Sequence, residues 1–130
     1  MLIKHLHLIA IITIFVFSWS YQYHDVSVIS GENNTKIKDI PVGIYPEDIA
    51  INQDTNMIFV ANGNYPGNDT VFVISGENNT KIKDILVGED PTDIAIHEDT
   101  NMIYVLNSDP NTVSVISGEN NTKINTIPKF

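Results

Sequence analysis

Acidic side chains gather at several points of this 130-residue sequence and are its first candidates for chemistry. His97 stands beside Glu98 and Asp99, a set of nitrogen and oxygen donors of the kind that binds metal ions. The matching segment 45 residues earlier has Asn52 in place of the histidine, and carboxylates in a turn are ordinarily solvated. We therefore predict that this group is a surface turn and not a metal site.

A second acidic group precedes two of the apolar segments, as Glu47-Asp48 and as Glu89-Asp90 with Asp93. Clustered carboxylates bind calcium in many proteins, but this spacing matches no known calcium-binding loop. The serine, histidine and aspartate residues form no nucleophile–base arrangement, no glycine-rich phosphate loop is present, and the chain has no cysteine. The sequence predicts no catalytic residue, no metal and no cofactor.

The elements that would position these side chains belong to a repeat. The octet SGENNTKI begins at residues 30, 75 and 117, so its copies lie 45 and 42 residues apart. The longer segments 48–60 and 93–105 also match almost residue for residue. A period of this length is typical of propeller blades and of helical repeats.

The apolar segments of the repeat are short, rich in β-branched residues, and bounded by Asn, Asp, Gly and Pro. No stretch after residue 25 keeps apolar residues at helical spacing over three turns. In the first full copy this predicts four strands. Three of them are apolar on both faces, as is typical of strands buried between two sheets. In the fourth strand, polar and apolar residues alternate. These strands span residues 48–51, 57–60, 70–75 and 80–88, and the octet is the turn before the fourth strand.

The predicted fold class is all-β, a partial β-propeller of about two and a half four-stranded antiparallel blades over residues 21–130. A half-blade spans 25–43 and full blades span 44–88 and 89–130. Closed propellers have about four to eight blades. We therefore expect a truncated product, a part of a longer propeller, or a subunit that completes a ring with other chains.

Residues 1–20 have the pattern of a secretory signal peptide, which would be helical where ordered. A basic residue precedes an apolar run, and a small-x-small site follows it. Export to the outside or to the cell surface is the resulting prediction. An uncleaved membrane anchor over residues 6–19 is one alternative, and a decayed blade is another. The basic residue is Lys4, the apolar run is Leu6–Phe17, and the cleavage site is Ser18–Ser20. In the decayed blade, Ile9–Ile11 and Ile14–Val16 would be the first two strands.

The charge balance restricts the partners. Sixteen acidic residues face seven lysines, for a net charge of −9 at pH 7. Such a surface repels phosphate backbones, so we expect no nucleic acid partner. It favours cations or basic proteins, and membrane contact is expected only through an uncleaved leader. Bare blade faces could also support self-association.

One loop face is the predicted binding surface. Links between blades and loops between the second and third strands emerge on the same side, because successive hairpins alternate in direction. A protein or a glycan is the expected partner there. The residues on this face are Tyr45, Asp48, Asn62, Asn64, Tyr65, Asp69, Glu89, Asp93, Asn107 and Asp109.

Four Asn-x-Thr sequons would be open to glycosylation in an exported chain. Three of them lie in the repeated octet, where the same residues are also good turn formers. Both interpretations stay open on the sequence alone. The candidate residues are Asn33, Asn68, Asn78 and Asn120.

The order of segments resembles the YVTN family of β-propeller repeats. Residues 91–96 (PTDIAI) are followed by 99–107 (DTNMIYVLN) and 111–116 (NTVSVI), and the resemblance covers residues 25–127. It differs at Phe59, where the family has tyrosine, and at Lys129-Phe130, where it has a closing Val-Gly. The resemblance implies a bacterial or archaeal surface or secreted protein.

Three functional hypotheses follow. The first is a secreted or surface-displayed, non-catalytic interaction module. The second is part of an enzyme-type propeller, of the lactonase or dehydrogenase kind. The third is a truncated product with no activity of its own. A shared fold does not decide among them.

Overall fold

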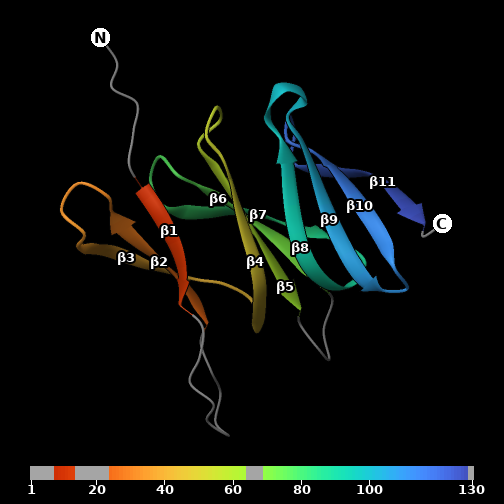
Figure 1. Ribbon diagram of the computed structural model, residues 1–130, viewed down its shortest axis with the longest axis horizontal. Coiled ribbons are helices and arrows are strands. Elements are labelled where there is room, and N and C mark those ends of the chain that lie inside the picture. Colours follow the sequence, from red (N-terminus) through yellow and green to blue (C-terminus); the bar gives the residue numbers. More distant parts are fainter. Residues whose placement is uncertain (1–7, 14–23, 64–68, 129–130) are drawn as a thin grey trace, which may run out of the picture.

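The computed structural model describes residues 8–13, 24–63 and 69–128. These residues contain no α-helix, one short 3-10 helix, and strands that form three antiparallel sheets (Figure 1). The first sheet has β1 (Leu8–Thr13), β2 (Asp25–Ser30) and β3 (Lys36–Pro41). The second has β4 (Tyr45–Asn52), β5 (Met57–Gly63), β6 (Thr70–Ser75) and β7 (Thr80–Leu86). The third has β8 (Glu89–His97), η1 (Glu98–Thr100) after it, β9 (Met102–Asp109), β10 (Thr112–Ser117) and β11 (Thr122–Pro128).

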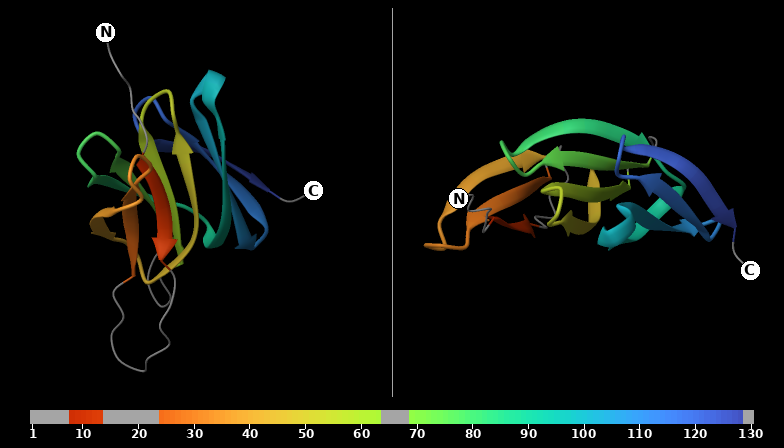
Figure 2. Two further views of the ribbon diagram at one scale, coloured as in Figure 1. Left: turned by 60° about the vertical axis from the view of Figure 1, so that its left-hand side comes forward. Right: turned by 90° about the horizontal axis from the view of Figure 1, so that it is seen from above.

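Within each sheet every strand pairs with its neighbour in sequence, so the chain runs from an inner edge to an outer edge and then starts the next sheet. Seen from above, the three sheets form an arch, with β4 and β8 toward the concave side and β7 and β11 toward the convex side (Figure 2). Successive antiparallel sheets around a common axis are the blades of a propeller. The prediction of an all-β partial propeller is confirmed.

Two apolar clusters hold the sheets together. In β5, Ile58 and Val60 face the first sheet, whereas Phe59 and Ala61 face the third. Successive side chains of a strand point to opposite faces, so a strand between two sheets is apolar throughout. The cluster between the first and second sheets contains Val26, Val28, Ile40, Ile58, Val60 and Ile74. The cluster between the second and third contains Phe59, Ala61, Val71, Val73, Ile85, Ile94, Ile103, Val105 and Ile116.

The repeated octet forms the turn between the third and fourth strands of each sheet. Its second asparagine has left-handed backbone geometry in all three copies, with φ of 57° at Asn34, 56° at Asn79 and 55° at Asn121. Asparagine tolerates this conformation better than most residues. The outer strand that follows is largely exposed in each sheet, as the alternating sequence predicted.

The expected helical leader is wrong at Leu8–Thr13, which is a strand. β1 pairs with β2 from Leu8↔Ser30 to Thr13↔Asp25, and β5 pairs with β6 in the same way, from Met57↔Ser75 to Asn62↔Thr70. β1 therefore holds the second-strand position of a blade, and the first sheet has three strands instead of two. The decayed-blade alternative had placed Ile9–Ile11 in the first strand. Residues 1–7 and 14–20 of the leader lie outside the described residues.

Across the described part of the chain, no helix is long and apolar enough to cross a membrane.

Candidate functional site

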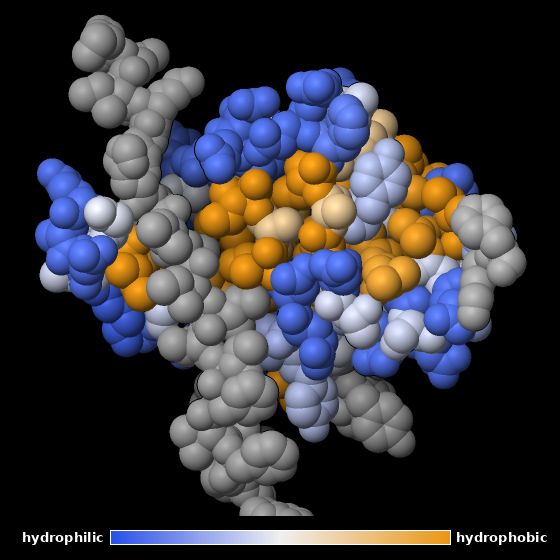
Figure 3. All heavy atoms as spheres, viewed as in Figure 1, coloured by the Kyte–Doolittle hydropathy of each residue, from blue (hydrophilic) through white to orange (hydrophobic). Residues whose placement is uncertain are grey.

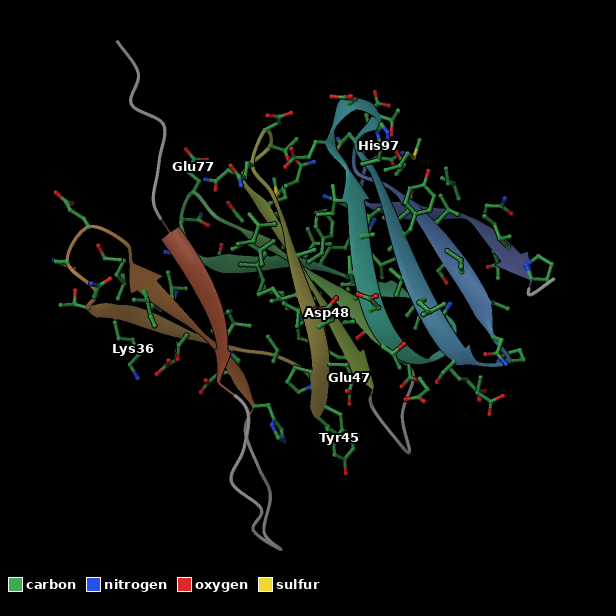
Figure 4. The ribbon with its side chains drawn as sticks, in the orientation of Figure 1. Lys36, Tyr45, Glu47, Asp48, Glu77 and His97 are labelled. Carbon is green, nitrogen blue, oxygen red and sulfur yellow. The ribbon has the colours of Figure 1, made fainter. Side chains whose placement is uncertain are left out.

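The strand directions bring the links between sheets, residues 42–44 and 87–88, to the same edge as the loops after β5 and β9. We call this the connector edge. Figure 4 shows Tyr45 at this edge, followed along β4 by Glu47 and then Asp48, with His97 and Glu77 at the opposite edge. The predicted binding residues lie on the connector edge, except Asn64 and Tyr65, which fall outside the described residues.

Asp48 joins two sheets. A register shift between Pro46 and Asp48 interrupts the pairing of β4 with β5, and such bulges redirect side chains. The Oδ2 atom of Asp48 accepts the backbone N–H of Ile94 at 2.7 Å, so the inner strand of one sheet binds the inner strand of the next. Removal from water raises the pKa of Asp48; the Ile94 N–H opposes this, and a hydrogen bond with Asp93 adds to it.

We expect Asp48→Asn to change how stability depends on pH. A carboxyl whose folded-state pKa is raised favours folding at low pH, and this contribution is lost as pH rises from the ordinary value of 3.8 through the raised value. Asparagine keeps an oxygen acceptor for the N–H of Ile94 and cannot ionise. Relative to wild type, the variant should gain stability as pH rises above 3.8, in urea unfolding monitored by circular dichroism.

The matched control is Asp54→Asn, at an exposed carboxyl in the turn after β4. Its difference from wild type should show no comparable gain over the same pH interval. An Asp48→Asn variant that instead loses stability relative to wild type as pH rises would contradict this account of Asp48.

Asn62 and Asn107 occupy equivalent positions and are both fully buried. Asn62 accepts the N–H of Gly43 through Oδ1 at 3.0 Å and donates through Nδ2 to the carbonyl of Val60 at 3.2 Å. Asn107 donates through Nδ2 to the Oγ of Ser114 at 3.0 Å. Asn62 therefore binds the link that enters its sheet directly. Asn107 instead binds Ser114, whose Oγ accepts the N–H of Gly88 in the corresponding link at 3.3 Å.

Asp69 has a similar structural role. Its Oδ2 atom accepts the N–H of Asp90 at 2.6 Å, and its backbone carbonyl accepts the N–H of Val87 at 3.2 Å. Asp90 has a left-handed φ of 54°, and its carboxyl accepts the hydroxyl of Ser108. These contacts fix the link between the second and third sheets.

Four of the predicted binding residues on the connector edge are exposed to solvent: Tyr45, Glu89, Asp93 and Asp109. The ring of Tyr45 lies 6.3 Å from that of His24, tilted by 41°. Exposed aromatic rings and carboxylates are groups that contact partners, in contrast to the buried amides beside them. The structure thus divides the predicted set into side chains that hold the sheets and side chains that face solvent.

His97 lies at the opposite edge, in a hollow of about 440 Å³ between β4 and β8. Its Nδ1 is 3.1 Å from the hydroxyl of Thr100, and the Oε1 of Glu98 accepts the N–H of Gln53 at 3.1 Å. In the described ranges, no three side chains of His, Cys, Asp or Glu come together as metal ligands do. His97 thus contacts its own turn, and Glu98 joins that turn to the equivalent turn of the second sheet.

The three octet sequons share one geometry. In each, the threonine hydroxyl donates to the Oδ1 of the first asparagine at 2.6 Å, in the pairs Thr35–Asn33, Thr80–Asn78 and Thr122–Asn120. The three asparagines are exposed. Turn chemistry accounts for the repeated residues, and glycosylation stays a prediction. Asn68 lies outside the described residues.

Sequence reasoning missed Ser114, which is buried in β10. Its Oγ receives hydrogen bonds from the Asn107 side chain and, at 3.3 Å, from the N–H of Gly88. The available signal was its position: serine stands in TVSVIS where the previous repeat has Phe72 in TVFVIS. A polar residue in an otherwise apolar strand usually has a buried partner.

The sheets and their connector edge define the class of protein as a β-propeller built from successive four-stranded blades. The sequence matches no protein-family model and no curated protein, so the resemblance to YVTN repeats stays a prediction.

Solved structures are similar to the chain in fold. Hydrazine synthase of Kuenenia stuttgartiensis has a TM-score of 0.74 and 26% identity, over 81% of this chain and 30% of that one. The β-propeller domain of the Trilobed protease from Pyrococcus furiosus, with an open velcro topology, has a TM-score of 0.66 and 14% identity, over 95% and 38%. Dihydro-heme d1 dehydrogenase NirN in complex with DHE has a TM-score of 0.60 and 16% identity, over 89% and 28%. The chain thus matches between 28% and 38% of the length of these proteins.

Proposed function

We propose that this chain is a non-catalytic binding module of the β-propeller type whose connector edge binds a basic protein partner. The observation that carries the proposal is the charge of that edge. Apart from His24 and the phenol of Tyr45, every ionisable side chain in the described ranges 24–25, 41–48, 61–63, 69–70, 86–93 and 106–112 is a carboxylate. These residues are Asp25, Glu47, Asp48, Asp69, Glu89, Asp90, Asp93 and Asp109.

The chemistry of recognition follows from this edge. Exposed carboxylates attract lysine and arginine side chains, and a face of one sign speeds the encounter with an oppositely charged partner. Tyr45 adds an exposed aromatic ring on which a guanidinium group can stack. The lysines of β3 and β7, which would oppose a basic partner, lie on the outer strands away from this edge.

The test is binding of a lysine- and arginine-rich peptide, with a glutamate-rich peptide of the same length for comparison. A triple variant, Glu47→Gln with Glu89→Gln and Asp109→Asn, removes three exposed charges from the connector edge. We expect affinity for the basic peptide to fall about tenfold, equal to about 1.4 kcal/mol. Calorimetric titration at low and at physiological salt measures this.

The octet supplies a matched control. Glu32→Gln with Glu77→Gln and Glu119→Gln removes the same number of charges from exposed positions at the opposite edge. Affinity should then change by less than about twofold. Equal losses from the two triple variants, or no binding of the basic peptide by the wild-type chain, would refute the proposal.

An enzyme-associated propeller is the second candidate. Its support is the likeness to hydrazine synthase and to dihydro-heme d1 dehydrogenase NirN. An absorption titration with haem separates the two proposals. A saturable change at one haem per chain would favour the enzyme-associated function, and a haem spectrum unaltered by the protein would favour the binding module.

Export is a further part of the proposal, supported by the signal-like pattern of residues 1–20. Cleavage after Ser20 would remove Leu8–Thr13, which is β1 of the first sheet. Export with cleavage and a retained β1 are therefore mutually exclusive. The intact mass of the protein purified from its native cells decides between them, and its fractionation shows whether an uncleaved leader keeps it at the membrane.

A further inference from the structure

The third sheet has one face packed against the second sheet and one face directed away from it. The face directed away is equivalent, residue by residue, to the face of the second sheet that the third sheet buries. In the second sheet, Phe59 is 1% exposed and Ala61 is 0% exposed, because the third sheet covers them. Their equivalents in β9 are Tyr104, 37% exposed, and Leu106, 47% exposed. Among the described residues, nothing lies over this face of the third sheet.

The neighbouring strand extends the same face. In β10, Val113 pairs with Leu106 and Val115 with Tyr104, so their side chains share a side of the sheet. The equivalents in β6 are Val71 and Val73, both completely buried against the third sheet. On the third sheet, Val113 is half-buried and Val115 is 7% exposed. The apolar face that the repeat covers with another blade is therefore open to solvent at the third sheet chiefly at Tyr104 and Leu106.

The first sheet carries a matching surface. Val26 and Val28 of β2 face the second sheet, so Ile29 faces the other way. The equivalents of Ile29 are Ile74 and Ile116, each 0% exposed and packed against the preceding sheet. Ile29 is thus the residue with which a blade of this repeat contacts the blade before it.

The arch places the two surfaces at its ends. Seen from above, the first and third sheets both turn toward the concave side (Figure 2). Apolar side chains extend across that side between polar rims (Figure 3). A second arch, rotated by half a turn, would face each third sheet with a first sheet.

We propose that the face of the third sheet formed by Tyr104, Leu106, Val113 and Val115 binds the first sheet of a second copy of this chain, at Ile29, and that the two copies close a ring. The ring uses each contact twice, which is the closed symmetry of a dimer. This assembly is independent of the connector edge and its partner, so either proposal can fail alone.

The first experiment is sedimentation equilibrium of the full chain up to about 100 μM, a range in which a dimer of micromolar affinity is fully formed. The expected mass is twice the 14.5 kDa of the chain. A monomer throughout that range, or open-ended polymers, would overturn the proposal.

Two variants test the faces. Leu106→Asp and Ile29→Asp each place a charge in one half of the contact, and each should weaken dimerisation at least a hundredfold. Ile82→Asp, at an exposed position of the outer strand β7, is the control and should remain dimeric. Circular dichroism confirms that each variant is folded, and Leu106→Gln replaces Leu106→Asp if that variant is not.

Mixing the two variants tests the head-to-tail arrangement. The Leu106→Asp chain keeps an intact Ile29 face, and the Ile29→Asp chain keeps an intact Leu106 face, so together they can form one complete contact. A mixed dimer stronger than either variant forms alone is expected. Dimerisation lost with Leu106→Asp but unchanged with Ile29→Asp would indicate that third sheets pair with each other and would overturn the proposal.

Discussion

Replacing Phe59 by alanine is expected to lower the free energy of unfolding by about 3–5 kcal/mol. The ring is 1% exposed and fills the space between the second and third sheets, in one cluster with Val73, Val105 and Ile116. Truncation removes most of its buried apolar surface and leaves a cavity that paired strands on both sides cannot close. Urea unfolding followed by circular dichroism measures the loss.

The control is Ile82→Ala in the same sheet. Ile82 lies on β7 and is 52% exposed, so its truncation removes little buried surface and should cost less than about 1 kcal/mol. Phe59→Leu should fall between the two, because it keeps part of the volume. Comparable losses for Phe59→Ala and Ile82→Ala would mean that the second and third sheets do not pack as described.

Much of the fold could be predicted because the pattern of apolar residues along each strand of the repeat indicates which of its faces are buried. Strands β5 and β6 are apolar at successive positions, which indicates burial on both faces, and the two clusters are what those faces form. The outer strand β7 alternates and is exposed. The connector edge followed from strand direction alone, since successive hairpins point to alternate edges.

The roles of the connector-edge residues could not be predicted in the same way. Asp48 accepts an N–H from Ile94, 46 residues later, and a sequence does not give the relative position of two sheets to within a hydrogen bond. Asn62 is buried because its amide binds the link at Gly43. Both residues have the types expected of a binding surface, which is why the sequence assigned them to one.

The strand at Leu8–Thr13 could not be predicted, because its composition fits two different structures. The segment Leu8–Thr13 is almost uniformly apolar, a composition that suits both the hydrophobic region of a signal peptide and a strand buried on both faces. It lacks the polar turn residues that separate strands elsewhere in the repeat. Only the register with β2, which repeats that of β5 with β6, marks it as a second strand of a blade.

Gly76→Ala and Gly118→Ala are each expected to destabilise the protein by about 1–3 kcal/mol. Each glycine donates its N–H to the carbonyl of an asparagine in the turn between the first two strands of its sheet, Asn56 or Asn101, at 2.8 Å. A Cβ added to either glycine would lie 2.8 Å from that carbonyl oxygen. Backbone in a left-handed turn, with φ of 55° and 53°, cannot move aside without losing the hydrogen bond.

The octet provides its own control, because Gly31 holds the same position in the first sheet and is exposed. Gly31→Ala should change stability by less than about 0.5 kcal/mol. Gly76 and Gly118 lie in different sheets and share no partner, so the double variant should lose the sum of the single losses. If all three single variants lost the same stability, the glycine would be needed by the octet turn itself. Losses confined to Gly76 and Gly118 would instead show that it is required where two turns of one blade meet.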